Sequence, residues 1–324
     1  RHRYYSFDKK TGDILWTSTP GGMPADRNTS GNAIAGVVDG KRLYISGNAD
    51  GSIYALEART GELQWSFRLS KRGINGSVIL VGDTVFVGHS EENLDEATLG
   101  RAIAIDATGS GDVTDTHEIW RQPIKMGFPS PLYANDRLYV MDNSANLMAL
   151  DPKTGESFWT HEVGTVGKSA PVFADGKIYV TEVNGHFVIL EDKGDSVEEL
   201  DKEFLSVEDG RYAEVYASPA IAYGRIFFTT EEGLYAIGDK DRAFEVSTSK
   251  APEQPAEKQG GTEPATALVV PGDITISRST KPEFEVRLFN DIGQELSRTR
   301  TADWSLEGLA GSISDNGTLN VETD

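Results

Sequence analysis

The segment LDPKTGESFW at residues 150–159 decides the fold, because close copies of it recur along the chain. The other copies are FDKKTGDILW (7–16), LEARTGELQW (56–65) and the longer IDATGSGDVTDTHEIW (105–120). Before each of the last three copies lie two runs of alternating apolar and polar residues, separated by a turn rich in Gly, Asn and Asp. Such alternation indicates strands, and regular self-similarity indicates one structural unit used repeatedly. The repeat therefore predicts consecutive antiparallel four-stranded sheets.

The period of the repeat favours one architecture. Equivalent aromatic residues recur at intervals of 42, 53, 40 and 48 residues, namely Tyr44, Phe86, Tyr139, Tyr179 and Phe227. These intervals are near the ~40–50 residues of a propeller blade. We predict an all-β fold: a β-propeller of four-stranded blades, about six of them present, in a native ring of six to eight.

The chain divides into three predicted regions. Residues 1–245 form the propeller, which we expect to be N-terminally incomplete, because residues 1–16 supply two strands of a blade while 218–237 supply three. Residues 246–265 are rich in Pro, Glu, Gln, Gly and Ser and are predicted to be a flexible linker. Residues 266–324 are predicted to form an Ig-like β-sandwich, itself C-terminally incomplete, with Trp304 as its core anchor.

The repeated segment has a structural explanation. A short carboxylate can accept backbone N–H groups of the turn it begins, at Asp8, Asp106 and Asp151. Glycine can adopt positive φ within that turn, at Gly12, Gly61 and Gly155. The closing tryptophans are expected to fold over the turns and bury their rings between blades: Trp16, Trp65, Trp120 and Trp159.

Three departures from the pattern are visible. Glu57 replaces the aspartate of one turn, and Gly109 lies in a lengthened turn. The stretch EDKGDSVEEL at 191–200 has no tryptophan, so we expect that blade to pack less well at its rim.

The pattern Asp-x-x-Thr-Gly-x-x-x-Trp, preceded by Tyr-Val/Ile-x-x-x-Asp/Asn-Gly-x-Leu-x-Ala-Leu, resembles the PQQ-like β-propeller proteins over about residues 4–245. These proteins include quinoprotein dehydrogenases and the propeller lipoprotein of the bacterial outer-membrane β-barrel assembly machinery. The C-terminal region resembles a bacterial Ig-like domain. The resemblance implies docking tryptophans, an extracytoplasmic location in the periplasm or cell envelope, and protein partners.

Composition excludes several classes of function. The chain has 31 basic and 51 acidic residues in 324, a net charge of −20, so nucleic acid is not an expected partner. It has no cysteine, hence no disulfide or thiolate site. No apolar run approaches the ~18 residues of a membrane-spanning segment. Any association with the cell envelope would therefore not use a membrane-spanning helix within this sequence.

Two alternatives to a scaffold remain open. A PQQ-dependent quinoprotein oxidoreductase needs a stacking tryptophan and often a vicinal cysteine pair, and no tryptophan lies outside the repeats and the C-terminal region. A calcium- or carbohydrate-binding surface module would use acidic loops; the two candidate loops are Asp106, Asp112 and Asp115, and Glu91, Glu92, Asp95 and Glu96. Neither loop has the spacing of a defined calcium site, and the five histidines show no paired ligand spacing. We therefore predict no catalytic, cofactor-binding or metal-binding residue, with PQQ and Ca²⁺ as the open alternatives.

Loops at the axial face supply the candidate binding residues. Those entering the innermost strands carry Asn32, Asn75, Phe128, Lys168, Glu214 and Tyr216. Turns between strands carry Asn48, Asp50, Asn143, Asn146 and Asn184. If these loops share one rim, they form a polar surface for a peptide strand or a small ligand; otherwise they only complete hairpins. We predict a non-catalytic, extracytoplasmic scaffold for protein–protein interaction.

Overall fold

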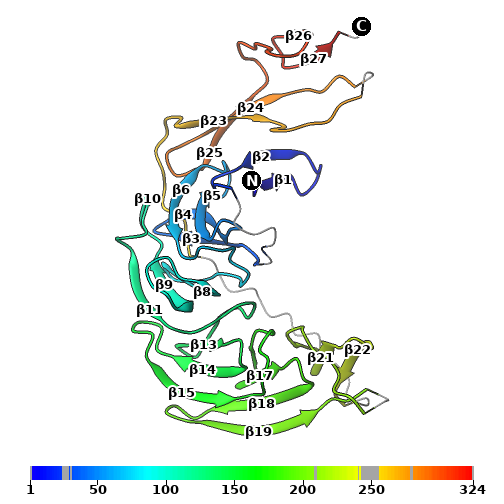
Figure 1. Ribbon diagram of the computed structural model, residues 1–324. Helices are drawn as coiled ribbons and strands as arrows, with labels where there is room; N and C mark the ends of the chain where they lie inside the picture. Colours follow the sequence, from blue (N-terminus) through cyan, green and yellow to red (C-terminus); the bar gives the residue numbers. More distant parts are fainter. Residues whose placement is uncertain are drawn as a thin grey trace.

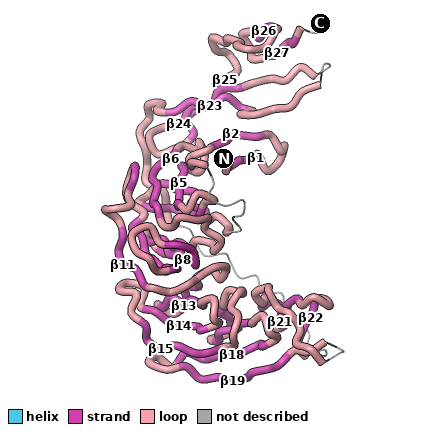
Figure 2. The backbone as a smooth tube through the Cα atoms, in the orientation of Figure 1, coloured by secondary structure: helices cyan, strands magenta, loops and turns pink. Residues whose placement is uncertain are grey.

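A computed structural model describes residues 2–23, 29, 31–207, 210–239, 241, 255–277 and 280–322. The described chain consists of strands and turns without a helix (Figure 2). Its sheets follow one another along an arc from β1 to β22, and the C-terminal strands lie beside the start of that arc (Figure 1). The all-β propeller prediction is confirmed.

Four complete blades occupy the middle of the arc. Blade 1 consists of β3 (Ile34–Val38), β4 (Lys41–Gly47), β5 (Ser52–Glu57) and β6 (Leu63–Arg68). Blade 2 consists of β7 (Ile79–Val81), β8 (Thr84–Glu92), β9 (Leu99–Asp106) and β11 (Glu118–Gln122). Blade 3 consists of β12 (Leu132–Ala134), β13 (Arg137–Met141), β14 (Asn146–Leu150) and β15 (Ser157–Glu162). Blade 4 consists of β16 (Val172–Ala174), β17 (Lys177–Thr181), β18 (His186–Asp192) and β19 (Val197–Phe204).

Partial sheets stand at the two ends of the arc. The N-terminal hairpin pairs β1 (Tyr4–Phe7) with β2 (Ile14–Ser18). At the other end, β20 (Ala220–Ala222), β21 (Arg225–Thr229) and β22 (Leu234–Ile237) form a three-stranded sheet. Of the expected six or so four-stranded blades, the described residues form four complete blades and two partial sheets. The size of the native ring stays a prediction.

The core lies between blades, because each blade is covered on both faces by its neighbours. All six residues of β5 are buried, as fits a strand with apolar groups on both faces. Ile45, Trp65 and Ile103 of blades 1 and 2 share one apolar cluster. Tyr139 and Val188 of blades 3 and 4 share another.

The C-terminal strands form two small sheets. One contains β23 (Thr266–Val270), β24 (Glu285–Phe289) and β25 (Glu295–Thr299), and the other contains β26 (Gly311–Ile313) and β27 (Leu319–Val321). The Ig-like assignment and the three-region division stay predictions, and residues 246–254 of the expected linker lie outside the described residues. Of the rest, Glu257 accepts hydrogen bonds from Arg42 (2.6 Å) and Arg59 (2.8 Å) of blade 1.

Candidate functional site

Each repeat tryptophan holds two neighbouring sheets together. A Cβ added at Gly61 would lie 2.5 Å from Cε3 of Trp16, so the indole packs on the glycine of the following sheet's turn. Gly155 has the same relation to Trp120, at 2.6 Å. The rings therefore cover the turn of the next sheet along the arc and not their own.

Indole N–H groups complete this contact, which we call the clasp. Trp65 is fully buried and donates to the Ala107 carbonyl at 2.9 Å. The other three indoles also donate to the next sheet: Trp16 to Ala58 O (3.3 Å), Trp120 to Pro152 O (2.9 Å) and Trp159 to Asp192 Oδ1 (3.1 Å). Since a buried N–H needs an acceptor, each clasp combines apolar burial with a directional bond.

Carboxylates organise the turns at the start of the repeated segments. Asp8 Oδ1 accepts the Lys10 N–H at 2.8 Å, and Asp151 Oδ1 accepts the Lys153 N–H at 2.7 Å. Asp106 Oδ1 accepts from the Thr108 backbone and hydroxyl. Gly12, Gly61 and Gly155 have φ between +73° and +80°. The predicted turn chemistry is thus present.

Glu57 replaces the aspartate in this turn and accepts the same kind of backbone hydrogen bonds through a longer side chain. Its Oε2 accepts the N–H groups of Arg59 (2.9 Å) and Thr60 (2.7 Å). Burial raises the pKa of Glu57. The side chain lies under the β24–β25 turn, where a Cβ added at Gly293 would meet its carboxylate.

The lengthened turn of blade 2 adds a strand to blade 1. Residues Gly111–Asp112 form β10, which pairs in parallel with β6 at Trp65 and Ser66. Val113 is buried in the blade 1 and 2 cluster. The sequence shows that this turn is longer than the others. It does not show which sheet the extra residues join, because they pair with the preceding blade.

The outermost strand of blade 4 has no tryptophan. Asp201 pairs with Ile189 there, in the place where Trp159 of blade 3 pairs with Ala149. Asp201 is exposed. The sheet of β20–β22 therefore receives no indole clasp from β19.

Hydroxyl groups link the innermost strands at one axial face. Ser77 Oγ accepts the Asn32 N–H (2.9 Å), and Ser130 Oγ accepts the Ser77 N–H (3.1 Å). Ser218 Oγ accepts the Ala170 N–H in the same way (2.8 Å). The corresponding residues of adjacent blades are therefore in contact, and the loops that precede them open on one face.

Four predicted residues occupy one position on successive blades. Asn75, Phe128, Lys168 and Tyr216 each lie two residues before the linked position, and we call them the axial row. Phe128 is 48% exposed and Tyr216 58% exposed. Lys168 Nζ lies 4.1 Å from the centre of the Phe128 ring, a cation–π contact.

The other two predicted residues flank the row. Asn32 is exposed and contributes its N–H to the serine links. Glu214 accepts the Tyr216 hydroxyl at 3.1 Å, and this bond raises the pKa of Tyr216. All six predicted residues are therefore near the beginnings of innermost strands.

Turns between the second and third strands of the blades lie on the same face. Asn143 of blade 3 accepts the Gly127 N–H through Oδ1 (2.8 Å) and the Gly167 N–H through its carbonyl (3.0 Å). Asn48 of blade 1 accepts the Ile74 N–H through its carbonyl. The two loop families thus share one rim.

Glu182 is a residue of this rim that the sequence did not single out. Its side chain is fully buried and accepts backbone N–H groups of Thr165 (3.0 Å), Val166 (2.7 Å) and Asn184 (2.9 Å). It therefore ties the loop entering blade 4 to a turn of that blade. An acidic residue before Val-Asn-Gly gave little indication of a buried side chain, because most acidic side chains are exposed to solvent.

The candidate calcium loops form ion pairs and local bonds. Asp95 and Glu96 both accept from Arg101, and Arg101 lowers the pKa of Asp95 to about 2. Asp112 accepts from Thr114. Among the described residues, no group of three or more His, Asp or Glu side chains converges as a metal site would require.

The fold and its clasp define a PQQ-like β-propeller repeat protein. The chain matches the family described as outer membrane protein assembly factor BamB over residues 2–112 and 100–199, and it belongs to that family.

Individual relatives are more distant. The chain is 24% identical to BamB of Yersinia pestis over 196 residues, covering 59% of this chain and 46% of the relative. It is 31% identical to BamB of Kangiella koreensis over 140 residues, covering 43% and 34%. Tetrathionate hydrolase of Acidithiobacillus ferrooxidans is 25% identical over 184 residues, covering 49% and 36%. The matches thus span less than half the length of these curated relatives.

A solved structure supports the fold. The crystal structure of BamB from Moraxella catarrhalis superposes with a TM-score of 0.54 at 16% identity, covering 72% of this chain and 66% of that one. In the described part of this chain, no helix is long and apolar enough to cross a bilayer.

Proposed function

We propose that this propeller is a non-catalytic scaffold that binds other proteins of the cell envelope, in a role like that named for its assembly-factor relatives. The family match and the assembly-factor relatives of Yersinia pestis and Kangiella koreensis support this role. The proposal places the protein outside the cytoplasm.

The axial row is the binding surface in this proposal, and the observation that carries it is the exposure of Phe128 and Tyr216 at one position of different blades. Exposed aromatic rings supply contact area at low conformational cost. The serine links and the Lys168–Phe128 contact hold the loops that carry these side chains, so little ordering is needed when a partner binds. A polypeptide lying across the row would contact several blades at once.

One relative, the tetrathionate hydrolase of Acidithiobacillus ferrooxidans, has the name of an enzyme. For this chain we propose no cofactor. The four repeat tryptophans are committed to clasps, and Trp304 donates to the Arg300 carbonyl within the C-terminal region. Titration with PQQ and Ca²⁺ tests this point: saturable stabilisation against heat with alcohol-dependent dye reduction would establish the quinoprotein alternative.

Photocrosslinking tests the scaffold. A photoreactive residue at Tyr216 should capture specific envelope proteins in native membranes. The matched control is Tyr223, which is 61% exposed and lies at the other end of the same innermost strand. Equal capture from both positions, or none from Tyr216, would contradict the axial row as the binding surface.

A further inference from the structure

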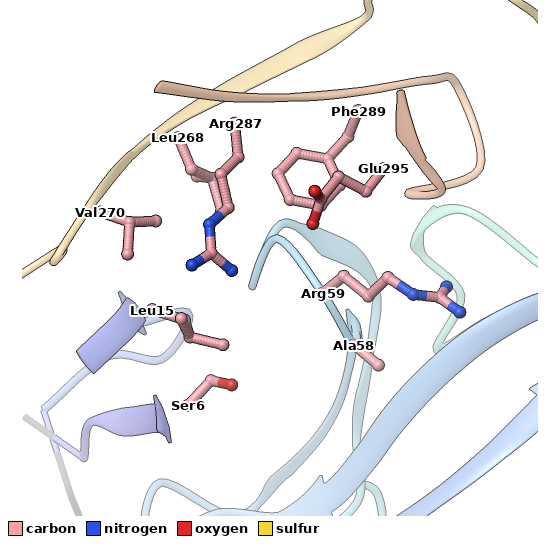
Figure 3. A pocket seen from close by; sticks show the side chains of 9 residues that line it. All are labelled: Ser6, Leu15, Ala58, Arg59, Leu268, Val270, Arg287, Phe289 and Glu295. Atoms are coloured by element: carbon pink, nitrogen blue, oxygen red, sulfur yellow. The ribbon is translucent and has the colours of Figure 1, made fainter. Parts of the chain in front are cut away.

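A cavity of about 240 Å³ lies between the N-terminal hairpin, the β5–β6 turn of blade 1 and the C-terminal sheet (Figure 3). Its apolar walls come from Leu15, Ala58, Leu268, Val270 and Phe289. The cavity is smaller than the roughly 300–1,000 Å³ of sites for drug-sized ligands. Its size and walls suit a short apolar group.

One guanidinium faces this apolar space. Arg287 of β24 extends toward Leu15 and Ser6 in Figure 3. Its side chain is only 12% exposed, and its Nε donates to Glu285 at 2.7 Å. In the described part of the chain, Glu285 is the one side chain bonded to this guanidinium, so its Nη groups keep donor capacity directed at the cavity.

The remaining polar groups set the polarity of the site. The Ser6 hydroxyl points into the cavity from β1 (Figure 3). Arg59 also lines the cavity but is bonded to Glu257, and Glu295 is bonded to Arg298. A ligand therefore meets two donors, Arg287 and Ser6, together with apolar side chains and the ion-paired side chains of Arg59 and Glu295.

We propose that this cavity binds a carboxylate carried on a short apolar group. A carboxylate can accept two parallel N–H bonds from a guanidinium, and such bonds strengthen where water is excluded. Leu15, Leu268 and Val270 would cover the apolar part. A free short-chain monocarboxylate and the C-terminal residue of a polypeptide share this chemistry. The site is separate from the axial row and does not depend on the proposed scaffold function.

Calorimetric titration of the full chain with hexanoate tests the proposal, with hexan-1-ol as the neutral comparison. We expect one saturable hexanoate site, with hexan-1-ol at least about tenfold weaker, as expected from losing a charged hydrogen bond. Arg287→Gln should weaken hexanoate binding by about tenfold or more. Arg300→Gln is the matched control, because Arg300 directly follows β25 of the same sheet, is 53% exposed, pairs with Glu283 and lies outside the cavity. It should leave affinity within about twofold.

If Arg287→Gln does not fold, variants of Ser6 and a peptide ligand test the same cavity. Ser6→Leu fills the cavity from a partly exposed position and should abolish hexanoate binding, whereas Ser6→Ala should only weaken it. A leucine-terminated tripeptide acid that displaces hexanoate, with its amide inactive, would identify a polypeptide C-terminus as the ligand. Failure of the acid would identify a free monocarboxylate.

Four results would overturn the inference. Hexan-1-ol binding as tightly as hexanoate would show an apolar cavity without carboxylate recognition. Equal loss in Arg287→Gln and Arg300→Gln would show general electrostatic attraction. No saturable hexanoate binding, or binding unaffected by Ser6→Leu, would show that the cavity is not the site.

Discussion

Replacing Gly155 by alanine tests whether the clasps hold the propeller together. Gly155 has φ +73°, and an added Cβ would lie 2.6 Å from Cε3 of Trp120. Gly12 occupies the same place in the N-terminal hairpin, with φ +80° and no atom within 4 Å of an added Cβ. The two substitutions share the backbone conformation and differ in the indole contact.

The expected costs follow from these contacts. A side chain in the left-handed region costs about 1 kcal/mol or somewhat more, partly offset by lower entropy of the unfolded chain, at both positions. At Gly155 the indole must also retreat by about 1 Å to reach ordinary contact. Trp120 is 7% exposed and bonded to the Pro152 carbonyl, so that movement disturbs a packed ring and a hydrogen bond. Overpacking of this kind costs about 1–3 kcal/mol, and we expect Gly155→Ala to exceed Gly12→Ala by that amount.

Urea unfolding followed by far-ultraviolet circular dichroism measures both variants without relying on tryptophan fluorescence. The midpoint should fall further for Gly155→Ala at an unchanged denaturant slope. In a Trp120→Leu background, the penalty of Gly155→Ala should shrink to that of Gly12→Ala. Equal penalties in the parent chain, or an excess that persists without the indole, would refute the clasp.

Three further predictions concern other buried groups. Burial, followed by the Arg101 charge, lowers the pKa of His89 from 6.5 to about 4, so the folded protein resists a proton that the unfolded chain accepts. The free energy of unfolding should be fully retained above pH 6.5 and fall by about 3 kcal/mol toward pH 4, as measured by urea unfolding across that range. Trp65→Phe leaves the Ala107 carbonyl without its donor and should cost about 2–3 kcal/mol in the same assay. Glu257→Gln removes the charge that bridges two arginines and should increase hydrogen exchange in residues 255–270, with little change in global stability.

Controls separate these effects from general damage. His89→Gln should flatten the pH dependence, because it removes the buried imidazole. An unchanged slope in His89→Gln would contradict the buried-histidine explanation. Loss of stability in Glu257→Gln comparable with that of Trp65→Phe would show that docking of the C-terminal region is part of the propeller core.

Local sequence was sufficient to predict the strands, the turns and the clasp residues. The Thr-Gly turn, the alternation and the closing indole recur within one short segment, and each depends on neighbours a few residues away. The axial row could also be proposed from the sequence, because residues at the same position of each repeat lie at the same place on each blade. Asn75, Phe128 and Tyr216 therefore lie where the repeat places them.

The links between repeats could not be obtained in this way. Ser77 and Ser130 bond across blades, Glu182 binds the loop entering its own blade, and β10 joins a sheet whose strand lies more than forty residues earlier. Nothing in the local pattern states which backbone group will meet a given hydroxyl or carboxylate.

The amino-acid sequence was thus sufficient to identify the repeating unit, because the repeat period and the residues of its turns can be read from short segments. Tertiary structure alone decided that Glu57 lies beneath the C-terminal sheet and that Arg287 faces an apolar cavity. Both outcomes depend on surfaces brought together from residues more than two hundred positions apart. The free energy of such contacts comes from desolvation and complementary shape, which exist only once the sheets have packed.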